Sequence, residues 1–168
     1  MRHLWAPWRM NYISAEPAKG GCVFCEKAAQ TDDERNLVLW RGERCFALMN
    51  IFPYNNGHLM IAPYAHLATI LELDAETLTE MMTLAQRCVK ACQEALGAHG
   101  FNIGINQGSV AGAGIADHAH MHVVPRWNGD TNFMPVLADV KVMPDFIENT
   151  YRQIREKLLP SDQAQPQP

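Results

Sequence analysis

The stretch DHAHMHVVPRW, residues 117–127, places three histidines at alternate positions: His118, His120 and His122. Apolar residues separate and follow them, and two of these are β-branched valines. Strict alternation with β-branched residues predicts a strand, in which side chains two positions apart share one face. We therefore expect the three imidazoles to project from one face, while the apolar residues between them point into a core.

The segments around this strand predict further strands and two helices. A long helix is predicted over 74–96, with Asp74 as its N-cap and Gly97 as its stop. A second amphipathic helix is predicted over 144–159. The remaining strands are expected within 37–40, 45–52, 58–64 and 101–106. This order predicts an α+β fold: an antiparallel sheet of about five strands with one long helix and a C-terminal helix.

The long helix has an apolar stripe at three- and four-residue intervals, which we expect to face the sheet. Its members are Leu78, Met81, Met82, Ala85, Cys88, Val89, Cys92 and Leu96.

The composition suits one compact domain. The chain has 168 residues, 48% of them hydrophobic, and we place the domain at 21–159. Residues 1–20 form an arm rich in aromatic side chains, which we expect to pack on another surface, such as a second subunit. Residues 160–168 are polar and proline-rich, and we expect them to be disordered.

Charge and cysteine usage exclude several classes of protein. The net charge is -4 and no block of Lys or Arg stands out, which disfavours a nucleic-acid partner. No apolar run has the length of a membrane helix, so no membrane partner is expected. Five irregularly spaced cysteines argue against a secreted disulfide scaffold. A reducing cytoplasm is therefore expected, where thiols are free to bind metal.

Cys22 and Cys25 form a CxxC pair in GCVFCEK. Two thiolates at this spacing can bind one tetrahedral ion, while a redox pair or a chance occurrence stays open. A zinc site needs two further ligands, and the candidates are His66 and one histidine of the row. The other cysteines lie on apolar stripes and are expected in the core: Cys45, Cys88 and Cys92.

The histidine row has two competing interpretations. Side chains from one strand diverge too little for three ligands to surround one ion, which disfavours a three-histidine metal centre. In the other interpretation one imidazole is a nucleophile that attacks phosphorus. The adjoining loop VAGAGIA, 110–116, favours phosphate chemistry, because glycine lets backbone amides approach an oxyanion closely.

At HAHMHVV the sequence resembles the histidine triad family, whose signature is His-x-His-x-His followed by two apolar residues. The resemblance covers residues 20–135, through CVFC, NIFPYNNGHLMIAPYAH, FNIGINQG and AGAGIADHAHMHVVPRW. It implies the fold of that family and a homodimer whose sheets join across the two-fold axis. It also implies a nucleotide hydrolase or transferase that works through a covalent nucleotidyl-histidine intermediate.

The resemblance implies roles residue by residue. His120 matches the nucleophile, His122 the histidine that contacts the phosphate, and His58 a fourth active-site histidine from a neighbouring strand. Asn50 and Asn106 match positions that contact the nucleoside sugar and the α-phosphate. The base pocket is expected around Phe46, Leu48 and Ile51, and the loop amides at the phosphate belong to Gly112, Ala113 and Gly114.

Zinc-bearing branches of the family use a CxxC pair, the histidine of a Pro-x-x-His stretch and the first histidine of the triad. Here these residues are Cys22, Cys25, His66 and His118. The implied cofactor is one structural zinc per chain, because four protein ligands leave no open position for water. The row is thereby divided: one imidazole serves the metal and two serve the phosphate.

PRWNGDTNFMPV and the arm segment LWAPWR make the chain more similar to the bacterial diadenosine-tetraphosphate phosphorylase-like branch. We therefore expect cleavage of dinucleoside polyphosphates at the α-phosphate, with water or inorganic phosphate as acceptor. Arg126 is expected to hold distal phosphates. Trp127 is expected either to stack on a second base or to pack in the core or an interface.

The leaving-group acid stays unassigned by the sequence. The fragile-histidine-triad branch has a glutamine in the loop before the triad, and the phosphoramidase branch has a serine there. This chain has only Ala and Gly over 111–114, although Ser109 lies just upstream. The alternatives are a purine nucleoside phosphoramidase and a nucleotide-binding protein with little turnover.

Overall fold

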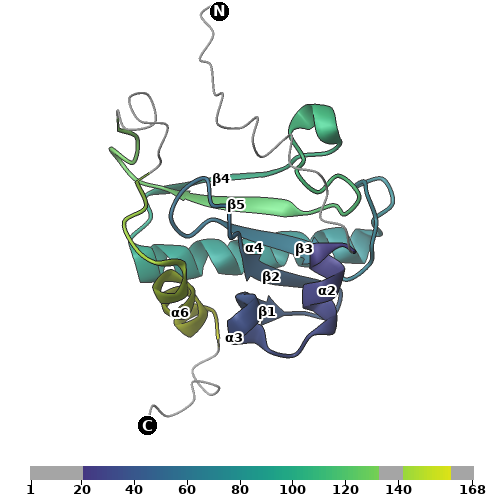
Figure 1. Ribbon diagram of the computed structural model, residues 1–168, viewed down its shortest axis with the longest axis horizontal. Coiled ribbons are helices and arrows are strands. Elements are labelled where there is room, and N and C mark those ends of the chain that lie inside the picture. The colour runs from purple at the N-terminus through teal and green to yellow at the C-terminus, as the bar shows by residue number, and fades with distance from the viewer. Residues whose placement is uncertain (1–20, 133–141, 160–168) are drawn as a thin grey trace, which may run out of the picture.

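The computed structural model describes residues 21–132 and 142–159. The predicted aromatic arm and C-terminal tail lie outside these residues. An antiparallel sheet of order β1-β2-β3-β5-β4 forms the centre of the molecule (Figure 1). The predicted α+β architecture with five strands, a long helix and a C-terminal helix is confirmed. The strands are β1 (Val38–Arg41), β2 (Cys45–Met49), β3 (Leu59–Pro63), β4 (Gly100–Ile105) and β5 (Met121–Arg126).

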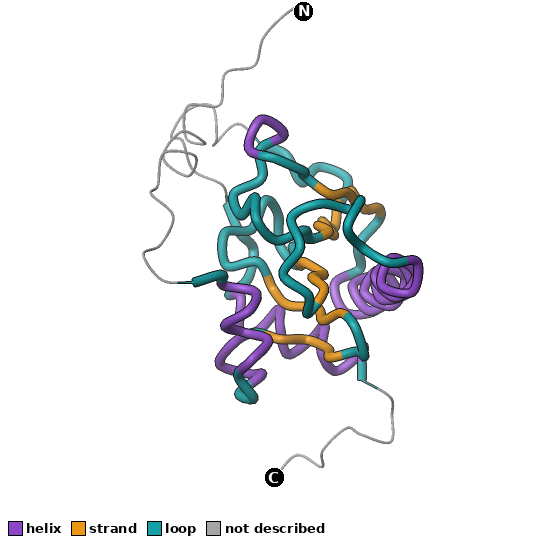
Figure 2. Tube along the Cα trace, turned by 90° about the vertical axis from the view of Figure 1, so that its right-hand side faces the viewer, coloured by secondary structure: helices purple, strands orange, loops and turns teal. Residues whose placement is uncertain are grey.

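The helices lie on both faces of the sheet. Those of the described residues are α2 (Val23–Ala29), α3 (Asp33–Asn36), α4 (Ala75–Leu96) and α6 (Ile147–Leu158), together with the short 3-10 turn η1 (Ser109–Ala111). None of them is long and apolar enough to cross a membrane. Figure 2 shows α4 nearly end-on at one side of the strands. The helix begins as predicted, because the Asp74 carboxylate accepts a hydrogen bond from the Thr77 amide at 2.7 Å.

The larger core lies between the sheet and α4, where β2, β3 and β5 direct alternate side chains toward the helix. Cys45, Cys88 and Cys92 are buried there, as predicted, and burial raises the pKa of the Cys45 and Cys92 thiols to about 12. Helix α6 closes this core with Tyr151 and Ile154, which are both buried.

The buried face of α4 differs from the predicted stripe. Leu78 and Met82 are 40% and 52% exposed, whereas Thr77, Leu84 and Ala91 are buried. The Glu80 carboxylate explains part of this orientation, because it accepts the backbone amides of the β1–β2 turn and so ties one side of the helix to that turn. Apolar periodicity alone does not tell which margin of a broad stripe is covered.

A smaller core lies on the other face of the sheet, beneath α2. Phe24 is fully buried here and packs with Phe46 and Leu48 of β2. Neither α2 nor α3 was predicted, because helices of seven and four residues are too short to display an apolar period.

The histidine strand is shorter than its alternating sequence predicts. β5 begins at Met121, so His118 and His120 precede the paired region. β3 ends at Pro63, which has no amide to donate, and the Ala119 amide instead donates to the Leu67 carbonyl at 2.6 Å. The alternation of faces persists nevertheless: Ala119 lies in the larger core, while the histidines belong to the α2 side.

Candidate active site and metal centre

His58 and His122 form a hydrogen-bonded pair on adjacent strands. The Tyr54 backbone N–H donates to His58 Nδ1 at 3.0 Å, so the proton of a neutral His58 sits on Nε2. His58 Nε2 lies 2.9 Å from His122 Nδ1 and donates to it. The proton of neutral His122 is therefore on Nε2. The Tyr54 amide thus fixes the tautomer of His58 directly, and through His58 it fixes the tautomer of His122.

Burial keeps both members of this pair neutral near pH 7. Desolvation, followed by the proximity of His122 and His120, lowers the pKa of His58 from 6.5 to about 3. Desolvation and the neighbouring His120 lower the pKa of His122 to about 4. The tautomers derived above therefore apply over the whole physiological range.

His120 has the tautomer of a nucleophile. Its Nδ1 lies 2.8 Å from the His118 carbonyl oxygen, which only accepts hydrogen bonds, so Nδ1 carries the proton. Nε2 then bears the free lone pair. The imidazoles of His120 and His122 meet edge to face, with ring centroids 4.8 Å apart. A ring with a free lone pair and a ring with a donor N–H are therefore direct neighbours.

Phe24 of α2 packs against His120 and His118. Its ring centroid is 4.8 Å from that of His120 and 5.1 Å from that of His118. Phe24 was not predicted to belong to the site. The available signal was its place between Cys22 and Cys25, which the predicted metal site holds close to His118.

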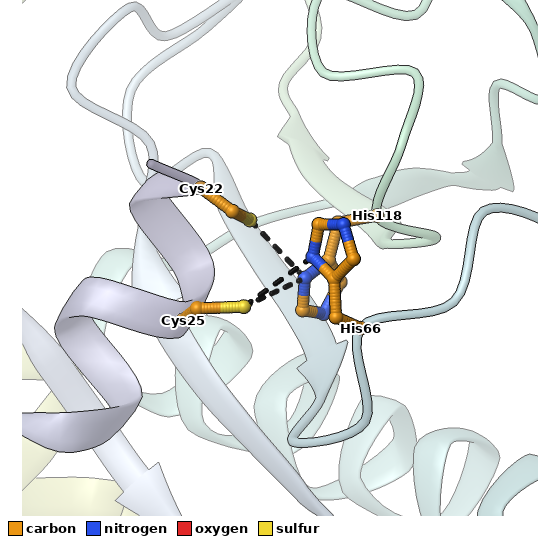
Figure 3. A group of neighbouring side chains, drawn as sticks. All are labelled: Cys22, Cys25, His66 and His118. Carbon is orange, nitrogen blue, oxygen red and sulfur yellow. Dashed lines mark hydrogen bonds between the residues drawn. The ribbon is translucent and has the colours of Figure 1, made fainter. Parts of the chain in front are cut away.

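The four predicted metal ligands converge on one point (Figure 3). Cys22 and Cys25 come from the start of α2, His66 follows β3, and His118 precedes β5. Their ligand atoms all lie within 4.8 Å of one another. Cys22 Sγ is 3.2 Å from His118 Nδ1, and Cys25 Sγ is 3.3 Å from His66 Nδ1.

This donor set fits zinc. Tetrahedral zinc with ordinary Zn–S and Zn–N bonds separates a sulfur from a nitrogen by about 3.5 Å, close to the distances observed. His118 Nε2 donates to the Pro63 carbonyl at 2.9 Å, which orients Nδ1 toward the thiols. Cys22 and Cys25 are free thiols, as metal binding requires.

Comparison with known proteins agrees with this geometry. The family model described as "HIT domain" matches residues 32–129, more than half of the chain. The chain belongs to the HIT family. It is also 37% identical to an AP-4-A phosphorylase of Mycobacterium tuberculosis, over 90% of this chain and 82% of that protein. A nucleotide-processing enzyme of the HIT family is thereby identified.

Two solved structures carry the same fold. A zinc-bound histidine triad family protein from Mycobacterium smegmatis is 31% identical, with a TM-score of 0.66 over 82% of this chain and 93% of that one. A hypothetical histidine triad nucleotide-binding protein from Sulfolobus tokodaii is 24% identical, with a TM-score of 0.65 over 82% and 91% of the two chains, and shows the fold alone.

The loop before the triad is a tight turn. Gly112 donates its amide to the Ser109 carbonyl at 2.9 Å, and Ala113 donates to the Gly108 carbonyl at 3.4 Å. These two amides are therefore engaged within the loop itself. A phosphate-binding role for Gly112, Ala113 and Gly114 in this HIT protein stays a prediction.

The predicted nucleoside-binding residues differ in exposure. Asn50 is buried, with its side-chain nitrogen 3.3 Å from His58 Nδ1. Asn106 is partly buried, and Ile51 is 53% exposed. Phe46 and Leu48 lie on the face of the sheet that carries the three histidines, which we call the triad face. Both are fully buried in the smaller core. Their contacts with a nucleoside stay predictions.

Arg126 and Trp127 are both held by protein groups. Arg126 donates from Nε and Nη2 to the Asp130 carboxylate at 2.6 and 2.9 Å, and from Nη1 to Asn102 at 2.7 Å. Trp127 donates from its indole to the Leu96 carbonyl at the end of α4. This position of Trp127 agrees with the packing alternative. The phosphate role of Arg126 stays a prediction.

Proposed function

We propose that the protein cleaves dinucleoside polyphosphates, such as diadenosine tetraphosphate, at the α-phosphate, with water or inorganic phosphate as acceptor. The observation that carries the proposal is the contact of His120 Nδ1 with the His118 carbonyl, which leaves the Nε2 lone pair of His120 free on a ring that adjoins His122. The similarity to an AP-4-A phosphorylase supports the substrate class.

In the first step His120 Nε2 attacks the α-phosphorus. A P–N bond forms and the bond from phosphorus to the bridging oxygen breaks, which releases the remaining phosphates with their nucleoside. The Nδ1–H bond to the His118 carbonyl stabilises the cationic imidazole of the intermediate. His122 donates from Nε2 to a phosphoryl oxygen as negative charge develops there.

In the second step the acceptor oxygen attacks the same phosphorus. The P–N bond breaks, the electron pair returns to His120 Nε2, and the acceptor's proton passes to solvent. With phosphate as acceptor, diadenosine tetraphosphate gives ADP and ATP, whereas hydrolysis gives AMP and ATP.

The fixed tautomers of His58 and His122 favour weakly basic leaving groups. His122 can share its Nε2 proton with a phosphoryl oxygen, but His58 cannot relay a replacement proton to it through Nδ1. That atom faces the Tyr54 backbone N–H, which does not release its proton. A polyphosphate leaves as an anion without protonation, whereas an amine requires a proton. The hydrogen bonds of His58 and His122 therefore favour dinucleoside polyphosphates over the phosphoramidate alternative.

The experiment compares the parent protein with His120→Ala on diadenosine tetraphosphate, with and without inorganic phosphate. His99→Ala is the matched control, because His99 is exposed. We expect His120→Ala to lose turnover while the control keeps it. The parent should retain a labelled nucleotide after denaturation in alkali, because the P–N bond of a nucleotidyl-histidine survives alkali and is cleaved by acid. Undiminished turnover by His120→Ala would sink the mechanism. Faster cleavage of adenosine phosphoramidate than of diadenosine tetraphosphate would favour the alternative.

The proposal includes one structural zinc per chain, held by Cys22, Cys25, His66 and His118. Four protein ligands give the metal a structural role: it holds α2 against the segment that carries His120. Elemental analysis of protein purified without chelators should find about one zinc per chain, and Cys25→Ser should lower that content. A metal-free protein with full activity would contradict this part of the proposal.

The proposal also includes a homodimer in the cytoplasm. β4 pairs only with β5 within the described residues, so its outer edge is open to a second copy. Ile103 on this strand and Leu78 and Met82 on α4 are apolar and exposed. We expect Met82→Glu to shift the protein from dimer to monomer in size-exclusion chromatography with light scattering. The exposed neighbour Thr83→Glu should leave the dimer intact.

A further inference from the structure

A groove of about 300 Å³ lies on the triad face, beyond the end of the histidine row. Val124 and Arg126 follow His122 at two-residue intervals along β5, so all three side chains share one face. Of this groove, the proposed mechanism uses only the Tyr54 backbone amide. Its lining residues are Tyr54, Asn55, Asn102, Val124 and Arg126.

The groove is continuous with the catalytic histidines. The Tyr54 ring stacks on the His122 imidazole, with centroids 5.6 Å apart and planes at 27°. Gly104 is the β4 partner of His122, and a Cβ added there would meet no atom within 4 Å. Open space therefore leads from His122 past Gly104 to Asn102, the β4 partner of Val124.

The chemistry of the groove suits a flat aromatic ring. Tyr54 is 44% exposed, and Val124 supplies an apolar surface. Arg126 is held at three of its N–H groups by Asp130 and Asn102, which fixes the guanidinium plane. A fixed guanidinium plane and a tyrosine ring both bind nucleobases by stacking. The Asp130 carboxylate compensates the arginine charge, which makes the groove less suited to a polyphosphate.

The position fits the leaving half of a dinucleotide. With a rise of about 3.3 Å per residue, Arg126 lies about 13 Å along β5 from His122. That span leaves room for phosphates between the reacting phosphorus and a base in the groove. We propose that this groove binds the base of the second nucleoside, which departs with the polyphosphate. This assignment rests on the proposed function.

The test compares two substrates that differ only in the second nucleoside: diadenosine tetraphosphate and adenosine 5′-tetraphosphate. We expect the parent to show a kcat/KM about tenfold higher for the dinucleotide, in the range of one base-stacking contact. Asn102→Trp fills the groove and should abolish this preference. Thr83→Trp introduces the same side chain at an exposed position of α4, on the opposite side of the sheet, and should keep it.

Tyr54→Leu is a second variant, in case Asn102→Trp folds poorly. Tyr54 touches His122, so only the ratio of the two kcat/KM values is compared, and this ratio should fall toward one. A parent with no preference, or variants that keep the parent's preference, would overturn the assignment of the groove. A parent that cleaves neither substrate would instead overturn the proposed function.

Discussion

Acidification from pH 7 to pH 5 should destabilise the folded protein through His58 and His122. In the unfolded chain both imidazoles have a pKa near 6.5, whereas in the folded chain burial lowers the values to about 3 and about 4. Between pH 6.5 and pH 4 the unfolded state therefore binds protons that the folded state does not. The contribution of these two histidines to the unfolding free energy is fully present above pH 6.5, and it is lost as the pH falls toward the folded pKa values.

The magnitude follows from these values. At pH 5 each histidine is 1.5 pH units below its unfolded pKa and still neutral when folded, so each costs about 2 kcal/mol. The pair together costs about 4 kcal/mol, a large part of the about 5–15 kcal/mol that stabilises a typical domain.

The assay is urea unfolding of the parent, His58→Asn and the exposed-histidine control His99→Asn, each at pH 7 and pH 5. Taking the difference between variants cancels the contributions of carboxylates and metal ligands. We expect the loss of unfolding free energy between the two pH values to be about 2 kcal/mol smaller in His58→Asn than in the parent. Equal losses in all three proteins would refute the reasoning.

Two further substitutions test the packing around the site. Phe24→Ala should lower the unfolding free energy by about 3–5 kcal/mol, because the ring is fully buried, while Val23→Ala, at a partly buried neighbour, should cost less; urea titration measures both. Gly57→Ala should lower the melting temperature more than Gly97→Ala. Both glycines have positive φ, but only at Gly57 would a Cβ collide, 2.6 Å from the Leu96 side chain; equal shifts would contradict the structure.

The long elements could be predicted because their apolar residues recur at a regular spacing. α4 has six turns of apolar periodicity and a capping aspartate, and its bounds were correct to a residue. Which margin of its stripe is buried depends on the β1–β2 turn bound to Glu80, a contact between segments far apart in the sequence. The start of β5 likewise depends on Pro63 in another strand.

The sequence predicts which residues form the site, but it does not predict which imidazole nitrogens carry protons. Alternate spacing groups His118, His120 and His122, and CxxC spacing groups Cys22 with Cys25. The tautomers could not be predicted, because the deciding partner of His58 is a backbone amide presented by the turn at Tyr54. A main-chain group leaves no residue-type signal in a sequence.

Cys22 and His118 are 96 positions apart in the chain, yet their ligand atoms lie 3.2 Å apart. An ion bound by both would join two segments from distant parts of the chain, at a site that the unfolded chain does not hold together. Binding to the folded chain alone stabilises it by about 2.7 kcal/mol when the free metal is at a hundredfold excess over its dissociation constant. Metal starvation would therefore reduce the amount of folded protein before it affected any single chemical step.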